Sequence, residues 1–395
     1  MYNTSRRSLL TALAAGAGGL AAGKAFAAGN DGHAAGYDVA PASNFQPLIP
    51  RRTGDPLKFT ASLDSGPIKA TSGGWARDIT ARTLPIATDI AGAHLFMNPG
   101  GSREMHWHTS AEWAYILSGH CQVTVVDPDG QLEVANFAPG DLWYFPGGHG
   151  HAIQTLGDAP CHAILTFNDG LYGEHGTFGI SDWMSRFDAA TLAQALGTEQ
   201  AQLARIPTGE TYIMQGAVIG RDSPQAREVT ELDRQHTHRY RLIDQKPWAS
   251  SPGGSIHIGA AKDFPLATGL AGMVVKLRPG AMHRPHWHPN ASEWHYVAKG
   301  RTRVTLFGAD KRMSVAELGV GDCAYIPRAC GHSVQNIGTE DAEIVGALDT
   351  STYQESSLND WLAKVPRHLL ANNFGVAEDV AANMRGRQGV IVPAA

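Results

Sequence analysis

Short stretches of apolar and β-branched residues, separated by turn residues, dominate the chain after its first fifty positions. Cys121–Val126 ends at the strong turn signal Asp127-Pro-Asp-Gly, and Arg303–Phe307 ends in the same way at Gly308-Ala-Asp. Leu142–Pro146 follows another tight turn. Segments of this length and composition favour strands, and glycine and proline mark their ends. Many short strands with frequent turns predict an all-β fold, either a barrel or a double-sheet jelly roll.

Helix-like periodicity is confined to the segments that follow each strand-rich region. It covers residues 182–196 in the first half of the chain and residues 359 to about 385 in the second. Residues 198–245, which connect the halves, contain Pro207-Thr-Gly-Glu and Asp222-Ser-Pro, so loops are expected there. We therefore expect short helices at the C-terminal end of each barrel.

The chain contains two copies of one unit, about 180 residues apart. Pro99-Gly-Gly-Ser-Arg-Glu-Met-His-Trp-His is matched 180 positions later by Pro279-Gly-Ala-Met-His-Arg-Pro-His-Trp-His. Glu112-Trp matches Glu293-Trp at an offset of 181, because the turn before the glutamate is one residue longer in the second copy. A period of this length indicates two tandem domains rather than a solenoid. We place the first domain at residues 51–235 and the second at residues 236–395.

The start of the chain has the features of an export signal. Ser5-Arg6-Arg7-Ser8-Leu9-Leu10 precedes an Ala/Gly-rich apolar run to about Ala22, and Ala25-Phe26-Ala27 supplies a small-x-small cleavage pattern. This combination is typical of a twin-arginine signal, which we assign to residues 1–27, with residues 28–50 as a flexible lead-in. The expected location is therefore the periplasm or the medium, with no membrane span in the mature protein.

The composition of the chain mainly excludes certain partners and kinds of metal site. Of the 395 residues, 43% are hydrophobic and 17% are charged, which is typical of a globular chain. The net charge of −5 and the lack of a basic run argue against a nucleic-acid partner. The four cysteines form no Cys-x-x-Cys pair, which argues against a metal held by cysteine. For Cys121 and Cys161, a disulfide bridge and two buried free thiols both remain open.

Three histidines and one glutamate in each copy are spaced as metal ligands. The first set is His106, His108, Glu112 and His151, and the second is His286, His288, Glu293 and His332. Each His-x-His pair lies on one face of a strand, because side chains alternate sides along a strand. The glutamate and the last histidine are 39 residues apart in both copies, so the last ligand must return on a later strand. Three imidazoles and one carboxylate suit a divalent metal and leave two of six coordination positions open.

His149 competes with His151 for the last ligand position of the first copy. The repeat favours His151, because it matches His332, whereas the counterpart of His149 is Cys330. We expect His149 at the rim of the pocket or on the surface. Trp107 and Trp287, between the paired histidines, point to the opposite strand face and are expected to pack against the next sheet.

These motifs resemble the cupin superfamily and, more specifically, the bicupin oxalate decarboxylases. The resemblance runs from about residue 73 to the C-terminus and rests on long matches: Gly73-Gly-Trp-Ala-Arg, Arg103-Glu-Met-His-Trp-His, Ala111-Glu-Trp-Ala-Tyr and Gly140-Asp-Leu-Trp-Tyr-Phe-Pro. It implies two jelly-roll barrels, a manganese ion in each, and conversion of oxalate to formate and CO2 with O2 required but not consumed. It also implies a homo-oligomer, a hexamer of stacked trimers.

The resemblance assigns roles to two further residues of the first copy. Arg103 matches an arginine three residues before the first ligand, and is expected to bind oxalate and stabilise the charge that develops on it. Glu174 matches the acid of a flexible lid and is expected to transfer the proton. The other readings are a structural salt bridge for Arg103 and a solvated loop carboxylate for Glu174. His175, beside the acid, has no assigned role.

The second copy departs from the family at two positions. His283 stands where Arg103 stands in the first copy, and the glutamate that the family has in its second domain falls at Gly346. We therefore expect the second site to keep its ligands, to lack its acid, and to be auxiliary to a catalytic first site.

Three functions are compatible with these residues. The leading hypothesis is a manganese oxalate decarboxylase, and the near alternative is an oxalate oxidase that gives CO2 and hydrogen peroxide on the same scaffold. A non-catalytic storage or binding bicupin is the third, and the retained ligands in both copies argue against it. The lid, Gly173-Glu-His-Gly-Thr177, departs from the family pattern Ser-Glu-Asn-Ser-Thr, so the choice between decarboxylase and oxidase stays open.

Overall fold

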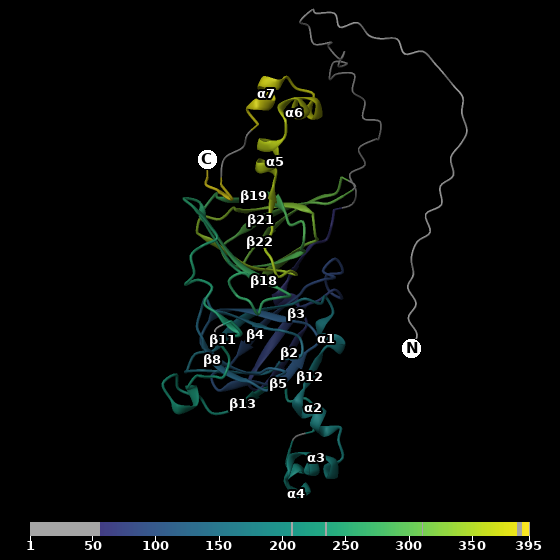
Figure 1. The fold of residues 1–395 in the computed structure, drawn as a ribbon, viewed down its shortest axis with the longest axis vertical. Helices are drawn as coiled ribbons and strands as arrows, with labels where there is room; N and C mark the ends of the chain where they lie inside the picture. Colours follow the sequence, from purple (N-terminus) through teal and green to yellow (C-terminus); the bar gives the residue numbers. More distant parts are fainter. Residues whose placement is uncertain (1–55, 207, 234, 310, 385–388, 395) are drawn as a thin grey trace, which may run out of the picture. The chain divides into compact units, whose positions relative to one another are not determined.

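The computed structural model describes residues 56–206, 208–233, 235–309, 311–384 and 389–394, without the side chains of Glu174 and His175. The predicted export signal and lead-in, residues 1–50, lie outside these ranges. The described chain forms four sheets of antiparallel strands, two in each copy of the repeat (Figure 1). The prediction of two tandem jelly-roll barrels, each followed by short helices, is confirmed.

The first barrel is built from two facing sheets. Its strands are β2 (Ile68–Thr71), β3 (Gly74–Ile79), β4 (Ala91–Met97), β5 (Gly101–His108), β6 (Glu112–Ser118), β7 (Cys121–Val126), β8 (Leu132–Phe137), β9 (Leu142–Phe145), β10 (Gly150–Thr155), β11 (Cys161–Phe167), β12 (Thr177–Gly179), β13 (Ile213–Gln215), β14 (Val229–Thr230) and β15 (Arg239–Tyr240). One sheet has the order β15-β9-β6-β11-β4-β3-β2, and the other has the order β12-β5-β10-β7-β8-β14, with β13 also paired to β5.

The second barrel repeats this plan. Its strands are β1 (Thr60–Ser62), β16 (Ala249–Ser251), β17 (Gly254–Gly259), β18 (Ala271–Leu277), β19 (Met282–Trp287), β20 (Glu293–Lys299), β21 (Thr302–Phe307), β22 (Met313–Leu318), β23 (Asp322–Ile326), β24 (Gly331–Asn336), β25 (Ala342–Leu348), β26 (Ser356–Ser357) and β27 (Ile391–Val392). One sheet has the order β1-β23-β20-β25-β18-β17-β16, and the other has the order β22-β21-β24-β19-β26, with β27 also paired to β19.

The two barrels exchange strands at the predicted domain limits. β1, at the start of the described chain, pairs with β23 of the second barrel, and β15, after the linker, pairs with β9 of the first. The predicted domain boundary between residues 235 and 236 therefore does not coincide with the division of the strands between the two barrels. Each short strand satisfies the backbone groups of a sheet edge that would otherwise be open, which ties the two copies together.

Two tryptophans from the ligand motifs cross the contact between the barrels. Trp113 and Trp294 each follow a ligand glutamate, and both side chains are fully buried. A Cβ atom added at Gly272 would lie 2.1 Å from the Trp113 ring, and one at Gly92 would lie 2.0 Å from the Trp294 ring. The indole of each barrel therefore lies directly on a glycine of the other. Both tryptophans belong to one continuous apolar cluster that spans the contact.

Helices follow each barrel, as predicted, but each predicted segment is broken into short pieces. The first group is α2 (Ile180–Ser185), α3 (Ala189–Leu196) and α4 (Gln200–Leu203), and the second is α5 (Leu358–Lys364), α6 (Arg367–Phe374) and α7 (Glu378–Ala382). α3 is capped at its N-terminus by Asp188, whose carboxylate accepts a hydrogen bond from the Thr191 amide, and at its C-terminus by Gly197 with φ 62°. None of the described helices is long and apolar enough to cross a bilayer.

The expectation that Trp107 and Trp287 pack against the next sheet is wrong. Trp107 stacks on Phe178 of β12, and the centroid of the Trp183 ring in α2 lies 5.4 Å from its own. Trp287 packs on Trp361 of α5, with ring centroids 5.7 Å apart. The outward face of each ligand strand is thus covered by the segment that follows the barrel. Strand alternation predicted the direction of these side chains correctly, but not what covers them.

The four cysteines form no disulfide bridge. Cys121 and Cys161 are buried inside the first barrel, and a hydrogen bond between the two thiols together with burial raises the pKa of the Cys121 thiol well above its usual value. Neutral buried thiols, one of the two readings of the sequence, are therefore what the structure contains.

His94, on β4 at the contact between the barrels, predicts a pH-dependent stability. Burial, followed by the repulsion from His162, lowers its pKa to about 4, so the folded protein resists protonation that the unfolded chain accepts near pH 6.5. Its contribution to stability is present above pH 6.5 and is lost as the pH falls toward 4, up to about 3 kcal/mol. In urea unfolding at pH 7 and pH 4.5, His94→Asn should lose less stability on acidification than the wild type. Exposed His236→Asn is the control, and equal losses in all three proteins would contradict the prediction.

Candidate metal centres and catalytic pocket

The strand β5 brings His106, His108 and Arg103 to one buried face. Alternation alone would place Arg103 and His106, which are three residues apart, on opposite faces. The pairing of β5 with β10 is irregular between them: His106 lies opposite His151, and Arg103 lies opposite Ile153. A bulge of this kind turns the strand by one residue, so all three side chains face inward and Met105 is left exposed. The same irregularity recurs in β19 between His283 and His286.

The four predicted ligands of the first copy meet inside the barrel. The group consists of His106, His108, Glu112 and His151, whose ligand atoms all lie within 4.8 Å of one another. Glu112 begins β6, and its Oε2 lies 3.1 Å from His108 Nε2 and 3.6 Å from His151 Nε2. These two imidazole nitrogens are buried and have no hydrogen-bond partner within the protein. Buried imidazole nitrogens normally have a partner, so their lone pairs fit a bound cation.

Hydrogen bonds on the far side of each ring orient these ligands. His106 Nδ1 donates to the carbonyl of Glu104 at 2.7 Å, and His151 Nδ1 donates to the carbonyl of His149 at 2.9 Å. Both rings therefore carry their proton on Nδ1 and present Nε2 to the centre. Glu112 is held in a related way, because the Trp143 indole donates to its Oε1 at 2.8 Å. Each ligand is oriented before a metal arrives.

The charge state of the first group also suits a cation. Burial raises the pKa of Glu112, but its contacts with the His108 and His151 rings outweigh this and leave it well below the usual value. Burial lowers the pKa of His106 and His108 below that of a free histidine. The carboxylate is thus ionised and these imidazoles neutral near pH 7, which is the form that binds a divalent metal.

His149 lies beside this centre but outside the metal group. Its Nδ1 is 3.1 Å from His238 Nε2, and His238 Nδ1 is 2.7 Å from Glu133 Oε2. The ring is half-buried at the end of the barrel. Its backbone carbonyl, rather than its ring, contacts the ligand His151.

The first group opens into a cavity of about 240 Å³. Its polar wall contains Arg103, which is 7% exposed. Arg103 Nη1 donates to the carbonyl of Tyr212 at 3.1 Å, and its guanidinium lies 4.3 Å from the centre of the Tyr212 ring. The nearest carboxylates, Glu104 and Glu210, lie 3.5 Å and 4.0 Å away. A cation fixed beside four metal ligands makes this cavity suited to a small anion.

Tyr212 was not predicted from the sequence, and its backbone is strained. Its φ is 60°, which non-glycine residues rarely adopt. Glu104 holds this conformation, because its Oε1 accepts a hydrogen bond from the Tyr212 amide at 2.9 Å and its own amide donates to the Tyr212 carbonyl. The linker therefore contributes Tyr212 to the wall of the pocket, although Tyr212 and Arg103 are more than one hundred residues apart in the chain.

The predicted lid lies at the mouth of this cavity. Its first three residues belong to the one-turn helix α1 (Tyr172–His175), and Tyr172, Gly173 and Thr177 line the cavity. The side chain of Glu174 lies outside the described part of the structure. At the last residue of the lid, Thr177 Oγ1 lies 2.9 Å from His108 Nδ1. The lid is thus joined to a predicted metal ligand by a residue three positions beyond its acid.

The second predicted set also comes together. The group is His286, His288, Glu293 and His332, all buried. Glu293 Oε2 lies 3.0 Å from His288 Nε2 and 2.9 Å from His332 Nε2. His286 Nδ1 donates to the carbonyl of Arg284 at 2.7 Å, as His106 does to Glu104. The position of Trp143 is taken by alanine here, and His295 contacts the outer oxygen of Glu293 instead.

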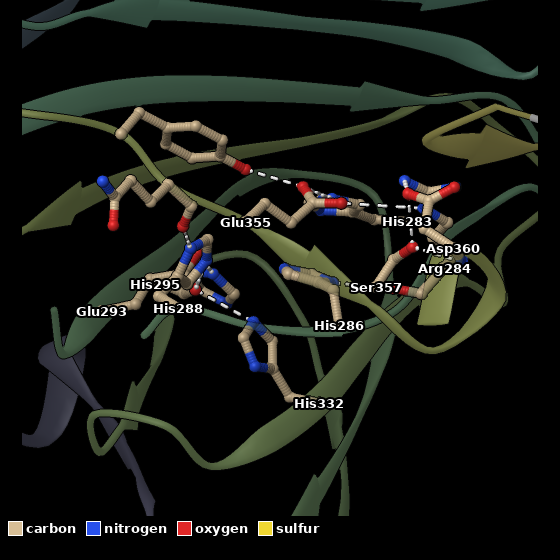
Figure 2. Close-up of polar contacts among 12 residues, drawn as sticks. His283, Arg284, His286, His288, Glu293, His295, His332, Glu355, Ser357 and Asp360 are labelled. Atoms are coloured by element: carbon tan, nitrogen blue, oxygen red, sulfur yellow. Dashed lines mark hydrogen bonds and ion pairs between the residues drawn. The ribbon is translucent and has the colours of Figure 1, made fainter. Parts of the chain in front are cut away.

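The expectation that the second site lacks an acid is wrong. Gly346 itself supplies no carboxylate, and a Cβ added there would lie 2.8 Å from Met273 Cε, the end of a flexible side chain, and 3.1 Å from the Trp294 carbonyl oxygen. Glu355, from the segment before β26, brings a carboxylate to the site instead, and it forms a further possible metal group with His283 and His286 (Figure 2). The only sequence signal for Glu355 was that it follows the last ligand, His332, by 23 residues, as Glu174 follows His151.

The family comparison matches the two copies of the repeat separately. The Cupin family model matches residues 61–203 and 240–382. Oxalate decarboxylase OxdC of Bacillus subtilis is 35% identical over 307 residues, which cover 78% of this chain and 79% of that protein. The chain belongs to the bicupin oxalate decarboxylase family. A probable oxalate decarboxylase of Arthroderma benhamiae is 30% identical and covers 85% of this chain and 83% of its own length.

Solved structures of the family have the same fold. The structure of the Bacillus subtilis oxalate decarboxylase at pH 4.6 superposes with a TM-score of 0.80 at 32% identity, over 88% of this chain and 91% of that one. A further solved structure of the same Bacillus subtilis enzyme comes from a study of its Mn(II) centres. The relatives therefore match this chain over both barrels, which contain the two candidate metal centres.

Proposed function

We propose that this protein is a manganese-dependent oxalate decarboxylase whose reaction takes place in the first barrel. The observation that supports this most directly is the cavity that joins four predicted metal ligands to the buried guanidinium of Arg103. A cation on each side of a small cavity favours a small dianion over neutral ligands. Relatives that share both barrels are named oxalate decarboxylases, in agreement with this chemistry.

The donor set fits the manganese that the family implies. Three imidazoles and one carboxylate can hold a divalent ion, and the buried, unpartnered nitrogens of His108 and His151 face the position it would take. When bound, the metal would neutralise negative charge on oxalate and supply one-electron chemistry. We propose one ion in each barrel, with the reaction confined to the first.

The protein groups of the first pocket have separable tasks in this proposal. Arg103 binds the carboxylate of oxalate that lies away from the ligands and stabilises charge that accumulates there. Glu174 accepts the proton of mono-oxalate and returns a proton to the carbon that becomes formate, so the proton count is balanced. A closed lid keeps water away from the reacting carbon during these steps.

A product analysis tests the proposal. The manganese-loaded protein is incubated with oxalate and O2, and formate, CO2 and hydrogen peroxide are quantified. Formate and CO2 in equal amounts without net O2 loss are expected. Peroxide with CO2 as the main carbon product would instead identify an oxalate oxidase, which the unusual lid sequence makes the near alternative. Absence of both products would identify a binding bicupin or another substrate.

Arg103→Met should weaken catalysis without emptying the first metal centre. The variant removes a charge-assisted contact of roughly 1.5–3 kcal/mol, which corresponds to a fall of about 10- to 150-fold in kcat/KM for oxalate. Manganese content should stay at the wild-type value, because Arg103 is not among the ligands. Arg303→Met, an exposed arginine in the second barrel, is the control. An unchanged kcat/KM in Arg103→Met would reduce Arg103 to a structural salt bridge.

Three further properties are proposed on the basis of the family and the sequence alone. O2 is required but not consumed, which assays with and without O2 would test.

The chain assembles into a homo-oligomer, a hexamer in the family arrangement, which sedimentation would test. Residues 1–27 direct export by the twin-arginine route, and Arg6→Lys with Arg7→Lys should then keep the protein in the cytoplasm in a cell fractionation.

A further inference from the structure

The cavity of the first barrel contains an acid that the proposed reaction does not use. Asp78 lies on β3 opposite Ala93 of β4, and it lines the cavity together with Ala76 and Leu95 from the same two strands. Alternation along β3 therefore turns its side chain inward. β3 and β5 belong to the two facing sheets, so Asp78 and Arg103 reach one small cavity from different sheets.

Asp78 also lies beside the lid. A Cβ atom added at Gly173 would lie 3.9 Å from Asp78 Oδ2, and Gly173 directly precedes Glu174 in the chain. Burial is the main cause of the raised pKa of Tyr172 and of Tyr212, and the negative charge of Asp78 adds to it in both. The carboxylate is thus close to both tyrosines of the cavity wall, where the wall meets the lid.

Within the described part of the structure, no side chain donates a hydrogen bond to the Asp78 carboxylate or forms an ion pair with it. The two cations of the cavity wall have other partners, because Lys69 pairs with Glu210 and Arg103 donates to the carbonyl of Tyr212. Burial raises the pKa of Asp78 above its usual value, so its ionised form is a strong hydrogen-bond acceptor. A half-buried carboxylate without a partner suits a ligand that brings a hydrogen-bond donor.

The charges around Asp78 come from several elements that enclose the cavity. The other ionisable side chains that line it are those of Lys69, Arg103, His106, His108, Glu112, Tyr172, Asp182, Glu210 and Tyr212. Glu112 contacts ligand histidines, and Asp182 pairs with Arg186 of the same helix. Asp78 is therefore the acid of this wall whose charge is left for the substrate.

Oxalate can enter such a cavity in two protonation states. The dianion presents only acceptor oxygens and negative charge to Asp78, which repels it. Mono-oxalate has one hydroxyl group, which can donate a charge-assisted hydrogen bond to Asp78 while Arg103 binds the same carboxyl group. One acid in the wall thus favours the first partner and disfavours the second, which is how specificity is commonly achieved.

We propose that Asp78 is a specificity residue of the first pocket, which selects mono-oxalate over the oxalate dianion by accepting a hydrogen bond from its carboxyl group. The shared proton is the one that Glu174 accepts in the proposed reaction, so Asp78 holds it in place until Glu174 takes it. Arg103 and the metal attract an anion, and Asp78 decides its protonation state. The role of Asp78 rests on the proposed function, because it requires that oxalate is the anion that binds.

Oxamate provides the test, because it has the shape of mono-oxalate with an amide in place of the hydroxyl. At pH 7 oxamate is a monoanion with a hydrogen-bond donor, whereas oxalate is a dianion. The dissociation constants of both are measured by calorimetry on the manganese-loaded protein without O2. Asp78→Asn removes the charge and adds a donor, so it should bind oxalate more tightly and oxamate more weakly. The ratio of the two constants should change by about 10- to 100-fold.

Two further variants make this measurement specific. Asp78→Ala removes the charge without adding a donor, and the ratio should change in the same direction. Asp182→Asn is the matched control, because it removes the same charge from a residue that lines the same cavity but pairs with Arg186. It should leave the ratio unchanged. Manganese content and the thermal unfolding midpoint verify that each variant is folded and loaded.

The outcomes separate the role of Asp78 from the proposed function. An unchanged ratio in both Asp78 variants, in a protein that binds oxalate and produces formate, would overturn the role of Asp78 and leave the function in place. Binding of neither anion to the wild type would overturn both. A changed ratio in a protein that produces no formate would support Asp78 as the residue that selects the anion and reject the reaction instead.

Discussion

Replacing Glu174 by glutamine is expected to lower kcat for formate production by about 10²–10⁴-fold while both manganese ions stay bound. The reason is that the amide cannot accept the proton of mono-oxalate or return one to carbon. The variant leaves the four ligands His106, His108, Glu112 and His151 in place, so metal analysis should give the wild-type value. Because glutamine is nearly isosteric, the lid should keep its attachment at Thr177, and KM should change less than kcat.

The control for this variant is Glu199→Gln, which changes a glutamate at the start of the surface helix α4. It should retain wild-type kcat, KM and metal content. Full formate production by Glu174→Gln would remove this residue from the mechanism. A shift from formate to peroxide would retain it, and would show that protonation at carbon is the step that separates decarboxylation from oxidation.

The second large effect concerns the paired ligands Glu112 and Glu293. Glu112→Ala should remove one manganese ion per chain and lower formate production by more than about 10³-fold, since the metal supplies several kcal/mol of transition-state stabilisation. Glu293→Ala should remove the other ion and lose much less activity. It should instead lower the thermal unfolding midpoint in the presence of manganese, because an ion bound only to the folded state stabilises that state.

Metal content, activity and unfolding measured on both variants decide which site is catalytic. The prediction requires that activity follow the first-site ion and that stability follow the second. If Glu293→Ala abolished activity at full occupancy of the first site, the catalytic site would be in the second barrel. The buried acid Glu355 would then have to be considered as its proton donor.

The ligand sets were predictable because their geometry is local and repeated. Two histidines on one strand face need only the alternation of side chains, and the equal spacing from Glu112 to His151 and from Glu293 to His332 marked the returning strand. The repeat also separated His151 from His149, and the structure brings together the residue that the repeat favoured. The β-bulge that turns Arg103 inward carries no comparable signal, and only the family pattern pointed to that residue.

The residues that sequence reasoning missed come from connections rather than from strands. Tyr212 lies in the linker, and its place in the pocket depends on a strained φ that is held by Glu104. Glu355 lies in a segment without regular structure just before β26. Loops have no periodicity from which a direction can be read, so the position of such side chains depends on the packing of the whole domain. The exchange of β1 and β15 between the barrels was missed for the same reason.

The sequence by itself determined the tandem all-β architecture and the two ligand sets, because strand periodicity, turn residues and a repeated motif are properties of short segments, whereas the lid was expected only from the family resemblance. Only the tertiary structure decided which side chains surround each site. The first ligand set opens into a cavity beside Arg103, whereas Glu355 and His283 lie beside His286 of the second. The strand after each barrel pairs with its ligand strand in the same register, so the position that carries Thr177 in the first barrel carries Glu355 in the second. Only this pairing of distant segments brings the two residues to the metal ligands.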